Sequence, residues 1–177
     1  DGGKEVRARS KADVLANLTE DHRLLTSENP DFVNLQEVDY EGDRSFRVDQ
    51  PDFFRTKNPE YNSSFANNYH SAYLFYPVTQ PIGKAKSGLL TLSKGQMTQA
   101  TRYSLPIETN FNKFFDLDRS FSVSEVTVDN GKKLFIYNVH YGIKRLPEGI
   151  SDRADWSRKY RYIHWFLIAL SIIVSGI

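Results

Sequence analysis

The sequence places one carboxylate at the end of an apolar run, where it could bind a metal ion or form a salt bridge. Residues 30–40 read PDFVNLQEVDY, an apolar run that ends in Gln36 and Glu37. The opening proline prevents a helix from running into the segment, and its bulky side chains predict a buried, central strand. A carboxylate placed there is costly to desolvate without a cation. Glu37 is therefore expected to be salt-bridged, solvated or a metal ligand.

Two further polar residues end a second predicted strand. Residues 133–140 read KLFIYNVH, and Asn138 and His140 share a face with the apolar positions 134 and 136. At about 3.3 Å per residue, the amide and the imidazole lie roughly 7 Å apart and point the same way. The two residues are either satisfied polar groups at a strand terminus or members of a site.

In this order, the two segments resemble the endonuclease/exonuclease/phosphatase superfamily of DNase-I-like nucleases, sphingomyelinases and inositol phosphatases. Residues 35–39, LQEVD, are similar to its first acidic motif, whose Glu binds a catalytic magnesium ion. Residues 138–140, NVH, are similar to its Asn-x-His motif, whose His contacts the scissile phosphate. The resemblance implies that Glu37 binds Mg²⁺ or Mn²⁺ and that His140 and Asn138 are catalytic.

The same resemblance makes two arginines candidate phosphate ligands. Arg44 opens the sequence RSF, which is similar to a short element after the acidic strand in bacterial members. Residues 115–119, FDLDR, are similar to the bacterial sequence before the Asn-x-His strand and end in Arg119. A guanidinium binds phosphate through two parallel hydrogen bonds. The alternatives are a solvated surface charge for Arg44 and a salt bridge to Asp116 or Asp118 for Arg119.

A helix and several strands must position these residues. A helix is expected from about Lys11 to Ser27, because Ser10 can cap it and apolar residues recur at helical spacing. Residues 41–68 are polar and predict a long irregular excursion after the first strand.

Further strands are expected over residues 69–76, 87–93, 96–105 and 120–128. The segment 96–105 is expected to be the hairpin partner of 87–93, where Ser-Gly resembles a superfamily feature that allows close strand packing. Apolar alternation slips near Glu125, which indicates a bulge. Asn-Gly at 130–131 predicts the turn into the last strand.

Composition limits the possible functions. The chain has 177 residues, no cysteine, 40% hydrophobic and 14% aromatic content. It can bury one sizeable core, while disulfides and thiolate metal sites are excluded. The net charge of +1 gives no overall attraction to nucleic acid or to an anionic membrane. A site for a polyanion must therefore be local.

The resemblance covers residues 10–140 and stops at both ends. Superfamily members begin with a strand that carries an Asn beside the metal, which is not found here. They also carry, after the Asn-x-His strand, a Gly-Asp-x-Asn strand end and an Asp-His or similar pair that orient and activate water. Neither follows residue 140.

We therefore predict a domain over residues 1–140 and a basic, then apolar tail over 141–177. The end of this tail is a buried helix, a marginal membrane anchor or a segment foreign to the family. Its apolar run is short for a membrane span of about 20 residues, so a span is not expected.

Together these observations predict an α/β (α+β) fold, a partial DNase-I-like four-layer sandwich with two mostly antiparallel sheets flanked by helices. The expected function is metal-dependent hydrolysis of a phosphodiester or phosphomonoester by an incomplete, weakly active or inactive form. The alternative is a non-catalytic remnant or binding module with the same fold. The substrate is a nucleic acid, a phospholipid head group or a sugar phosphate, and the chain is expected to be a monomer. The sequence does not choose between the bacterial cytoplasm and an extracytoplasmic location.

Overall fold

The structure is a computed structural model that describes residues 7–75, 78, 81–105 and 120–140. The chain separates into two units, Asp1–Tyr141 and Gly142–Ile177, and only the first contains described residues. Arg119 and the predicted tail, 141–177, lie outside the described residues. The domain boundary expected at residue 140 therefore stays a prediction. Among the described residues, no helix is long and apolar enough to cross a membrane.

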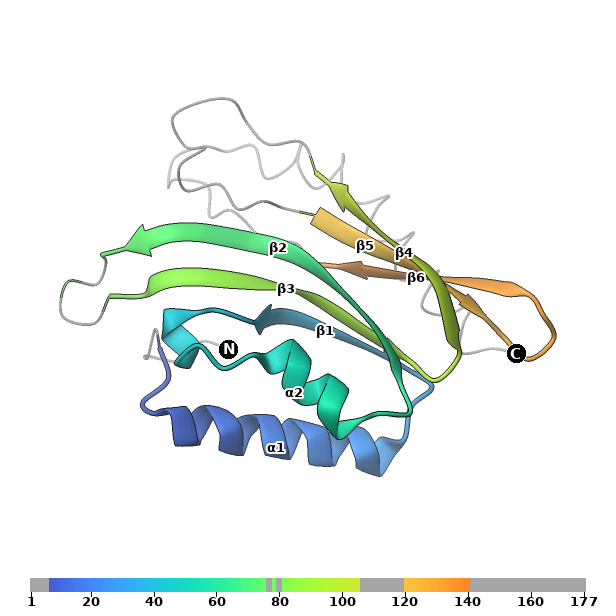
Figure 1. The fold of residues 1–177 in the computed structure, drawn as a ribbon, viewed down its shortest axis with the longest axis horizontal. Coiled ribbons are helices and arrows are strands. Elements are labelled where there is room, and N and C mark those ends of the chain that lie inside the picture. The colour runs from blue at the N-terminus through green and yellow to red at the C-terminus, as the bar shows by residue number, and fades with distance from the viewer. Residues whose placement is uncertain (1–6, 76–77, 79–80, 106–119, 141–177) are drawn as a thin grey trace, which may run out of the picture. The chain divides into compact units, whose positions relative to one another are not determined.

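The first sheet contains three antiparallel strands in the order β1-β3-β2. Their bounds are β1 Phe32–Asp39, β2 Asn62–Leu74 and β3 Gly83–Ser93. Figure 1 shows β3 between its two neighbours. The expectation that residues 30–40 form a central strand is wrong for the described sheet, because β1 lies at its edge. The most thoroughly buried strand is β3, whose central leucines are fully inaccessible.

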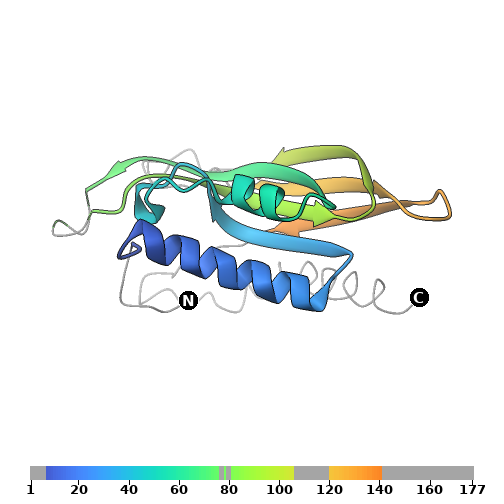
Figure 2. The ribbon, with the colours of Figure 1, turned by 60° about the horizontal axis from the view of Figure 1, so that its bottom comes forward.

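Helices α1 (Lys11–Glu28) and α2 (Gln50–Lys57) cover one face of this sheet (Figures 1 and 2). The core between them contains Val14, Leu18 and Phe54 from the helices and Val38 and Leu90 from the strands. Burial of these side chains is the main force that holds the helices on the sheet. The helices therefore pack on one face of this sheet, and the opposite face is left for the second sheet.

The two helices begin at caps that the sequence encodes locally. The Ser10 hydroxyl accepts a hydrogen bond from the Asp13 backbone N–H at 3.1 Å, so the helix predicted from Lys11 is confirmed. Asp49 caps α2 in the same way, with Pro51 in the first turn. The expected irregular excursion over 41–68 is therefore wrong: it holds the 3₁₀ helix η1 (Asp43–Ser45), α2 and the start of β2.

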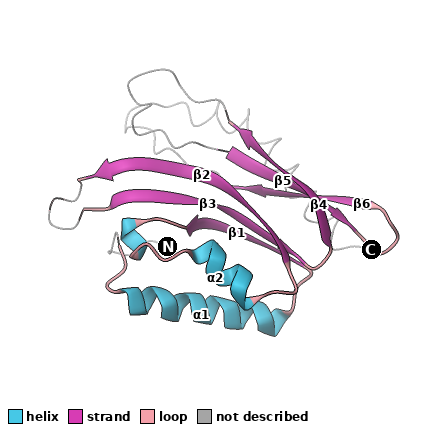
Figure 3. Ribbon diagram, in the orientation of Figure 1, coloured by secondary structure: helices cyan, strands magenta, loops and turns pink. Residues whose placement is uncertain are grey.

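The second sheet is also antiparallel and three-stranded, in the order β4-β5-β6. Its bounds are β4 Gln96–Ser104, β5 Ser120–Thr127 and β6 Lys133–Val139. The expected hairpin between 87–93 and 96–105 is wrong, since β3 pairs with β1 and β2 whereas β4 pairs with β5. The link at Lys94 and Gly95 instead carries the chain from one sheet to the other (Figure 3).

The Asn-Gly turn between β5 and β6 is confirmed. Gly131 has a φ of +74°, and its N–H donates to the carbonyl of Val128 at 2.8 Å. The turn fixes β6 as the antiparallel neighbour of β5, with Ser122 opposite Asn138. The turn therefore determines which residues of β6 face the first sheet.

Small hydroxyl side chains of β5 form much of the contact between the sheets. Alternate residues of β5 are buried without interruption, namely Ser120, Ser122, Ser124 and Val126. A bulge is present near Glu125, as predicted, but the extra residue is Thr98 of β4 and not a residue of β5. The Ser124 hydroxyl lies 2.9 Å from that of Ser64 on β2, so a polar contact bridges the sheets.

Candidate active site beside Gly88

The candidate metal ligand lies in a β-bulge. The register of β1 against β3 shifts between Leu35 and Val38, so Gln36 and Glu37 stand opposite one residue of β3. Glu37 has a φ of +56°, in the left-handed region that residues with a Cβ rarely adopt. Its side chain is 57% exposed. The bulge thus leaves this carboxylate exposed, although the next two residues of the strand, Val38 and Asp39, are buried.

A second bulge lies on the other side of β3 at the same level. Asn67 pairs with Gly88 and Tyr69 with Ser87, which leaves Asn68 as the extra residue of β2. A Cβ atom at Gly88 would clash with the backbone carbonyl of Ala66 and the ring of Phe65. The absence of a side chain at this position therefore allows the close approach of β2, as the family resemblance implied.

The structure brings together two residues that the sequence identified separately. His140 Nε2 lies 3.6 Å from Glu37 Oε1, although 103 residues separate them. The His140 side chain is 23% exposed. Both line an open cavity of about 230 Å³, together with Arg44, Asn68, Tyr69, Ser87 and Gly88. We call this the active-site cavity.

Arg44 is fixed at this cavity by a carboxylate. Its Nε and Nη2 donate to Asp39 Oδ2 and Oδ1 at 2.9 and 2.8 Å, and Asp39 is 3% exposed. The hydrogen bond to Asp39 is the main reason that the pKa of Arg44 is raised above its ordinary value. Arg44 is therefore a constant, ordered positive charge rather than a freely solvated one. Its binding of phosphate remains a prediction.

Asn138 lies beneath the cavity and holds the sheets together. It is 1% exposed, and its Nδ2 lies within hydrogen-bond distance of the carbonyls of Leu35 and Leu90, both at 3.2 Å. It also approaches Thr91 Oγ1 at 3.3 Å, while its own Oδ1 has no partner among the described residues. These contacts suit a structural amide that positions its neighbours. Asn138 is not among the residues that line the active-site cavity.

Several residues of the cavity were not identified from the sequence. Asn68, Tyr69 and Ser87 reach it because of the bulge in β2 and its pairing with β3. Asp39 was recognised as part of the acidic motif but not as the partner of Arg44. No local pattern marks Asn68, Tyr69 and Ser87 as cavity residues, because their positions depend on which strands become neighbours.

The residues present fit a cation that keeps most of its water ligands. Within the described part of the chain, no three His, Asp or Glu side chains gather in a group that could hold a metal ion. Asp39 is engaged by Arg44, which leaves Glu37 as the accessible carboxylate of the cavity. Magnesium sites commonly use one or two carboxylates and complete their shell with water and substrate phosphate oxygens.

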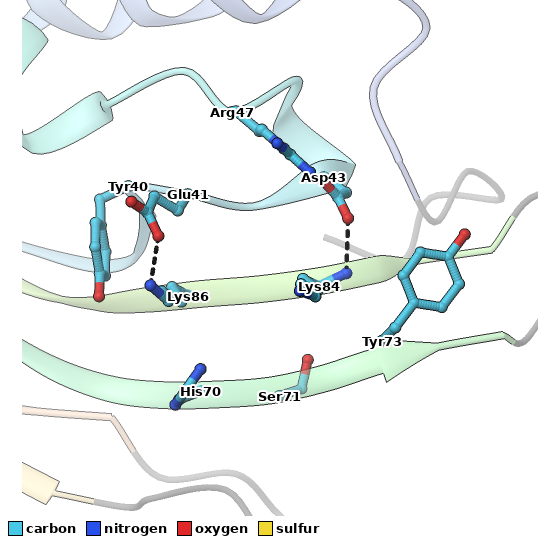
Figure 4. Close-up of a pocket in the computed structure, with 9 residues that line it drawn as sticks. All are labelled: Tyr40, Glu41, Asp43, Arg47, His70, Ser71, Tyr73, Lys84 and Lys86. Atoms are coloured by element: carbon cyan, nitrogen blue, oxygen red, sulfur yellow. Dashed lines mark hydrogen bonds and ion pairs between the residues drawn. The ribbon is translucent and has the colours of Figure 1, made fainter.

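A larger cavity of about 920 Å³ lies where the segment after β1 faces β2 and β3 (Figure 4). Most of its charged side chains are already paired. Lys86 contacts Glu41, and Asp43 accepts hydrogen bonds from Arg47 Nε at 2.8 Å and from the Lys84 backbone N–H at 2.9 Å. None of the described residues that were predicted to do chemistry lines this cavity. The candidate site is therefore the smaller cavity.

Solved structures with the same fold were found by structural comparison. An endonuclease/exonuclease/phosphatase from Beutenbergia cavernae DSM 12333 matches with a TM-score of 0.58 and 18% identity, over 73% of this chain and 34% of that one. An endonuclease/exonuclease/phosphatase family protein from Leptotrichia buccalis C-1013-b matches with a TM-score of 0.51 and 9% identity, over 77% of this chain and 51% of that one.

The chain thus has the fold of these proteins and spans between about a third and a half of their length. The predicted class, α+β with two antiparallel sheets as in a partial DNase-I-like sandwich, is confirmed. No family model matches the sequence, and neither does any curated protein.

Proposed function

We propose that this chain carries part of the active site of a metal-dependent phosphoesterase of the endonuclease/exonuclease/phosphatase family. One observation carries the proposal. Glu37 and His140, from two motifs far apart in the sequence, lie 3.6 Å apart on one open cavity in the fold of these proteins. A carboxylate beside an imidazole and a fixed guanidinium can serve a cation and a phosphate at the same place.

In the proposed site each residue has a separate role. Glu37 holds Mg²⁺ or Mn²⁺, which when bound supplies a positive charge that polarises a phosphoryl oxygen. His140 hydrogen-bonds to a phosphate oxygen as negative charge develops on it, and Arg44 adds a constant positive charge at the cavity. Asn138 positions the strand that carries His140. Arg119, outside the described residues, is proposed as a further phosphate ligand by resemblance alone.

The reaction proposed is hydrolysis of a phosphodiester or phosphomonoester in a nucleic acid, a phospholipid head group or a sugar phosphate. The cavity, of about 230 Å³, has room for the phosphate that these substrates share. The alternative function is a non-catalytic binding module with the same fold. The lack of a Gly-Asp-x-Asn motif in the 177 residues favours it for this chain taken alone.

Metal titration tests the proposal at its central residue. Binding of Mn²⁺ to the wild type should be weak but measurable by calorimetry or electron paramagnetic resonance, and Glu37→Gln should abolish it. Glu41→Gln is the matched control, because Glu41 is a nearby carboxylate that Lys86 already engages. Equal binding by the wild type and Glu37→Gln would remove Glu37 from the site and with it the proposal.

A further inference from the structure

Side-chain amides connect the two sheets in a regular series next to the active-site cavity. Three hydrogen bonds form it: Asn34 Nδ2 to the Tyr137 carbonyl at 3.4 Å, Asn138 Nδ2 to the Leu35 carbonyl at 3.2 Å, and Gln36 Nε2 to the Val139 carbonyl at 2.6 Å. We call Asn34, Asn138 and Gln36 the amide ladder. The donors alternate between β1 and β6, as main-chain donors alternate between two parallel strands.

The amide ladder has a single register. In all three hydrogen bonds the partners are 103 residues apart. Glu37 and His140 are also 103 residues apart, and each directly follows a partner of the last bond, Gln36 and Val139. The register of the ladder is therefore the register that places Glu37 opposite His140.

This connection is made by side chains because β1 and β6 belong to different sheets. The main-chain pairing of β1 is with β3, and that of β6 is with β5. Packing of apolar surfaces is not directional, so it leaves the relative position of two sheets weakly specified. Hydrogen bonds depend on distance and angle, and so they select one position.

The three amide side chains differ in how many further hydrogen bonds they make. Asn138 is buried and also approaches the Leu90 carbonyl of β3, and the Asn34 side-chain oxygen accepts a hydrogen bond from Thr91 at 2.9 Å. Gln36 is exposed, and among the described residues its side chain has one hydrogen bond, to the residue directly before His140. Its loss should therefore affect the position of His140 with little effect on the core.

We propose that Gln36 is a positioning residue: it fixes the Val139 carbonyl against the bulge of β1 and so holds His140 at Glu37. The consequence for metal binding rests on the proposed function, whereas the consequence for geometry does not. Gln36 directly precedes Glu37, the proposed metal ligand, in the bulge of β1, so its hydrogen bond also holds the backbone of that ligand. Groups that orient metal ligands from behind typically change metal affinity or activity by about 10- to 100-fold when they are replaced. We expect the same range for the affinity of Mn²⁺ on loss of the Gln36 amide.

The test compares the full 177-residue chain with Gln36→Met, which has a similar length and no donor. Gln96→Met is the matched control, because Gln96 is an exposed glutamine on β4, remote in the pairing from β1 and β6. The first readout is the nuclear Overhauser effect between the His140 ring and the Glu37 side chain. The second is Mn²⁺ affinity, and circular dichroism verifies that each variant folds.

We expect Gln36→Met to lose most of the Overhauser signal and to bind Mn²⁺ about 10- to 100-fold more weakly, with Gln96→Met unchanged. A signal that persists at full strength in folded Gln36→Met would overturn the proposal. Failure of the wild type to bind Mn²⁺ would overturn the proposed function instead, and the Overhauser comparison would still decide the role of Gln36. Should Gln36→Met not fold, Gln36→Asn, with an amide one methylene shorter, takes its place with the same expected loss of signal.

Discussion

At the scale of single residues, the site combines a strained backbone with a fixed charge. Glu37 has a left-handed backbone conformation, which costs a residue with a Cβ about 1–3 kcal/mol and is concentrated at functional sites. Arg44 is held by the buried Asp39, so it keeps its orientation without a ligand. Both features preorganise charged groups around one cavity.

The Arg44–Asp39 pair gives a first prediction. Arg44→Met leaves the buried Asp39 carboxylate without its charged partner, which should lower the free energy of unfolding by about 1–3 kcal/mol. Arg23→Met is the control, because Arg23 makes an equivalent two-bond contact with Glu20 on the exposed face of α1. Urea unfolding measures the free energy of unfolding of both variants. A loss in Arg44→Met no larger than that in Arg23→Met would show that the Asp39 carboxylate does not need its partner.

Asp43 gives a prediction about pH. Its pKa lies below the ordinary 3.8, first because of the Arg47 side chain and then because of the Lys84 backbone N–H. A lowered pKa in the folded state stabilises the protein above the unfolded pKa and loses this effect as the pH falls through the folded value. Asp43→Asn should therefore be less stable than the wild type at pH 7, by about 1 kcal/mol.

The difference between Asp43→Asn and the wild type should shrink once the pH falls below about 3.8, as the carboxylate protonates. Urea unfolding at pH 7, 4 and 2.5 measures it. A difference that stays constant down to pH 2.5 would mean that the carboxylate does not contribute through its charge.

At the scale of elements, two bulges on either side of β3 create the site. The bulge of β1 turns Glu37 outward, and that of β2 brings Asn68 and Tyr69 to the cavity. Bulges bend a strand and redirect its side chains, which is why they are frequent beside active sites. Gly88 lies between them and allows the close approach of β2.

Gly88→Ala should therefore be destabilising. The added methyl group meets main chain that cannot move aside without shifting β2, and overpacking of this kind costs about 1–3 kcal/mol. Gly131→Asn is the control: nothing lies within 4 Å of a Cβ there, and asparagine tolerates the positive φ of the turn. Thermal unfolding gives the melting temperatures of both variants and of the wild type. Equal melting temperatures for Gly88→Ala and the wild type would contradict the close approach of β2.

At the scale of the whole molecule, the site depends on both sheets. Glu37 and Arg44 belong to the part of the chain around the first sheet, whereas His140 follows the last strand of the second. The chain spans between about a third and a half of the solved structures that share its fold. The proposed hydrolysis also needs a group that orients and deprotonates water, and no residue in the described part of the chain was identified for this task.

We therefore expect the 177-residue chain to hydrolyse bis(p-nitrophenyl) phosphate at or near the background rate with Mg²⁺ or Mn²⁺. General-base catalysis contributes about 10²- to 10⁴-fold, so a chain without the base forfeits most of the rate. Release of p-nitrophenol with and without metal measures this. Metal-dependent turnover that disappears in both Glu37→Ala and His140→Ala would reveal a base elsewhere in the chain.

The sequence by itself determined the features that depend on neighbouring residues. The cap at Ser10 located α1, and the Asn-Gly turn located the hairpin of β5 and β6. The alternation of β6 placed Asn138 and His140 on one face. Such features are local, because a cap, a tight turn and the alternation of side chains each involve only a few consecutive residues.

Only the tertiary structure decided how these parts combine. The chain changes sheet between β3 and β4, so the neighbours of β3 come from β1 and β2 and not from the next strand in the sequence. The bulge at Glu37 and its 3.6 Å contact with His140 both depend on that topology. Strand register and sheet packing join residues far apart in the chain, and no local pattern specifies such contacts.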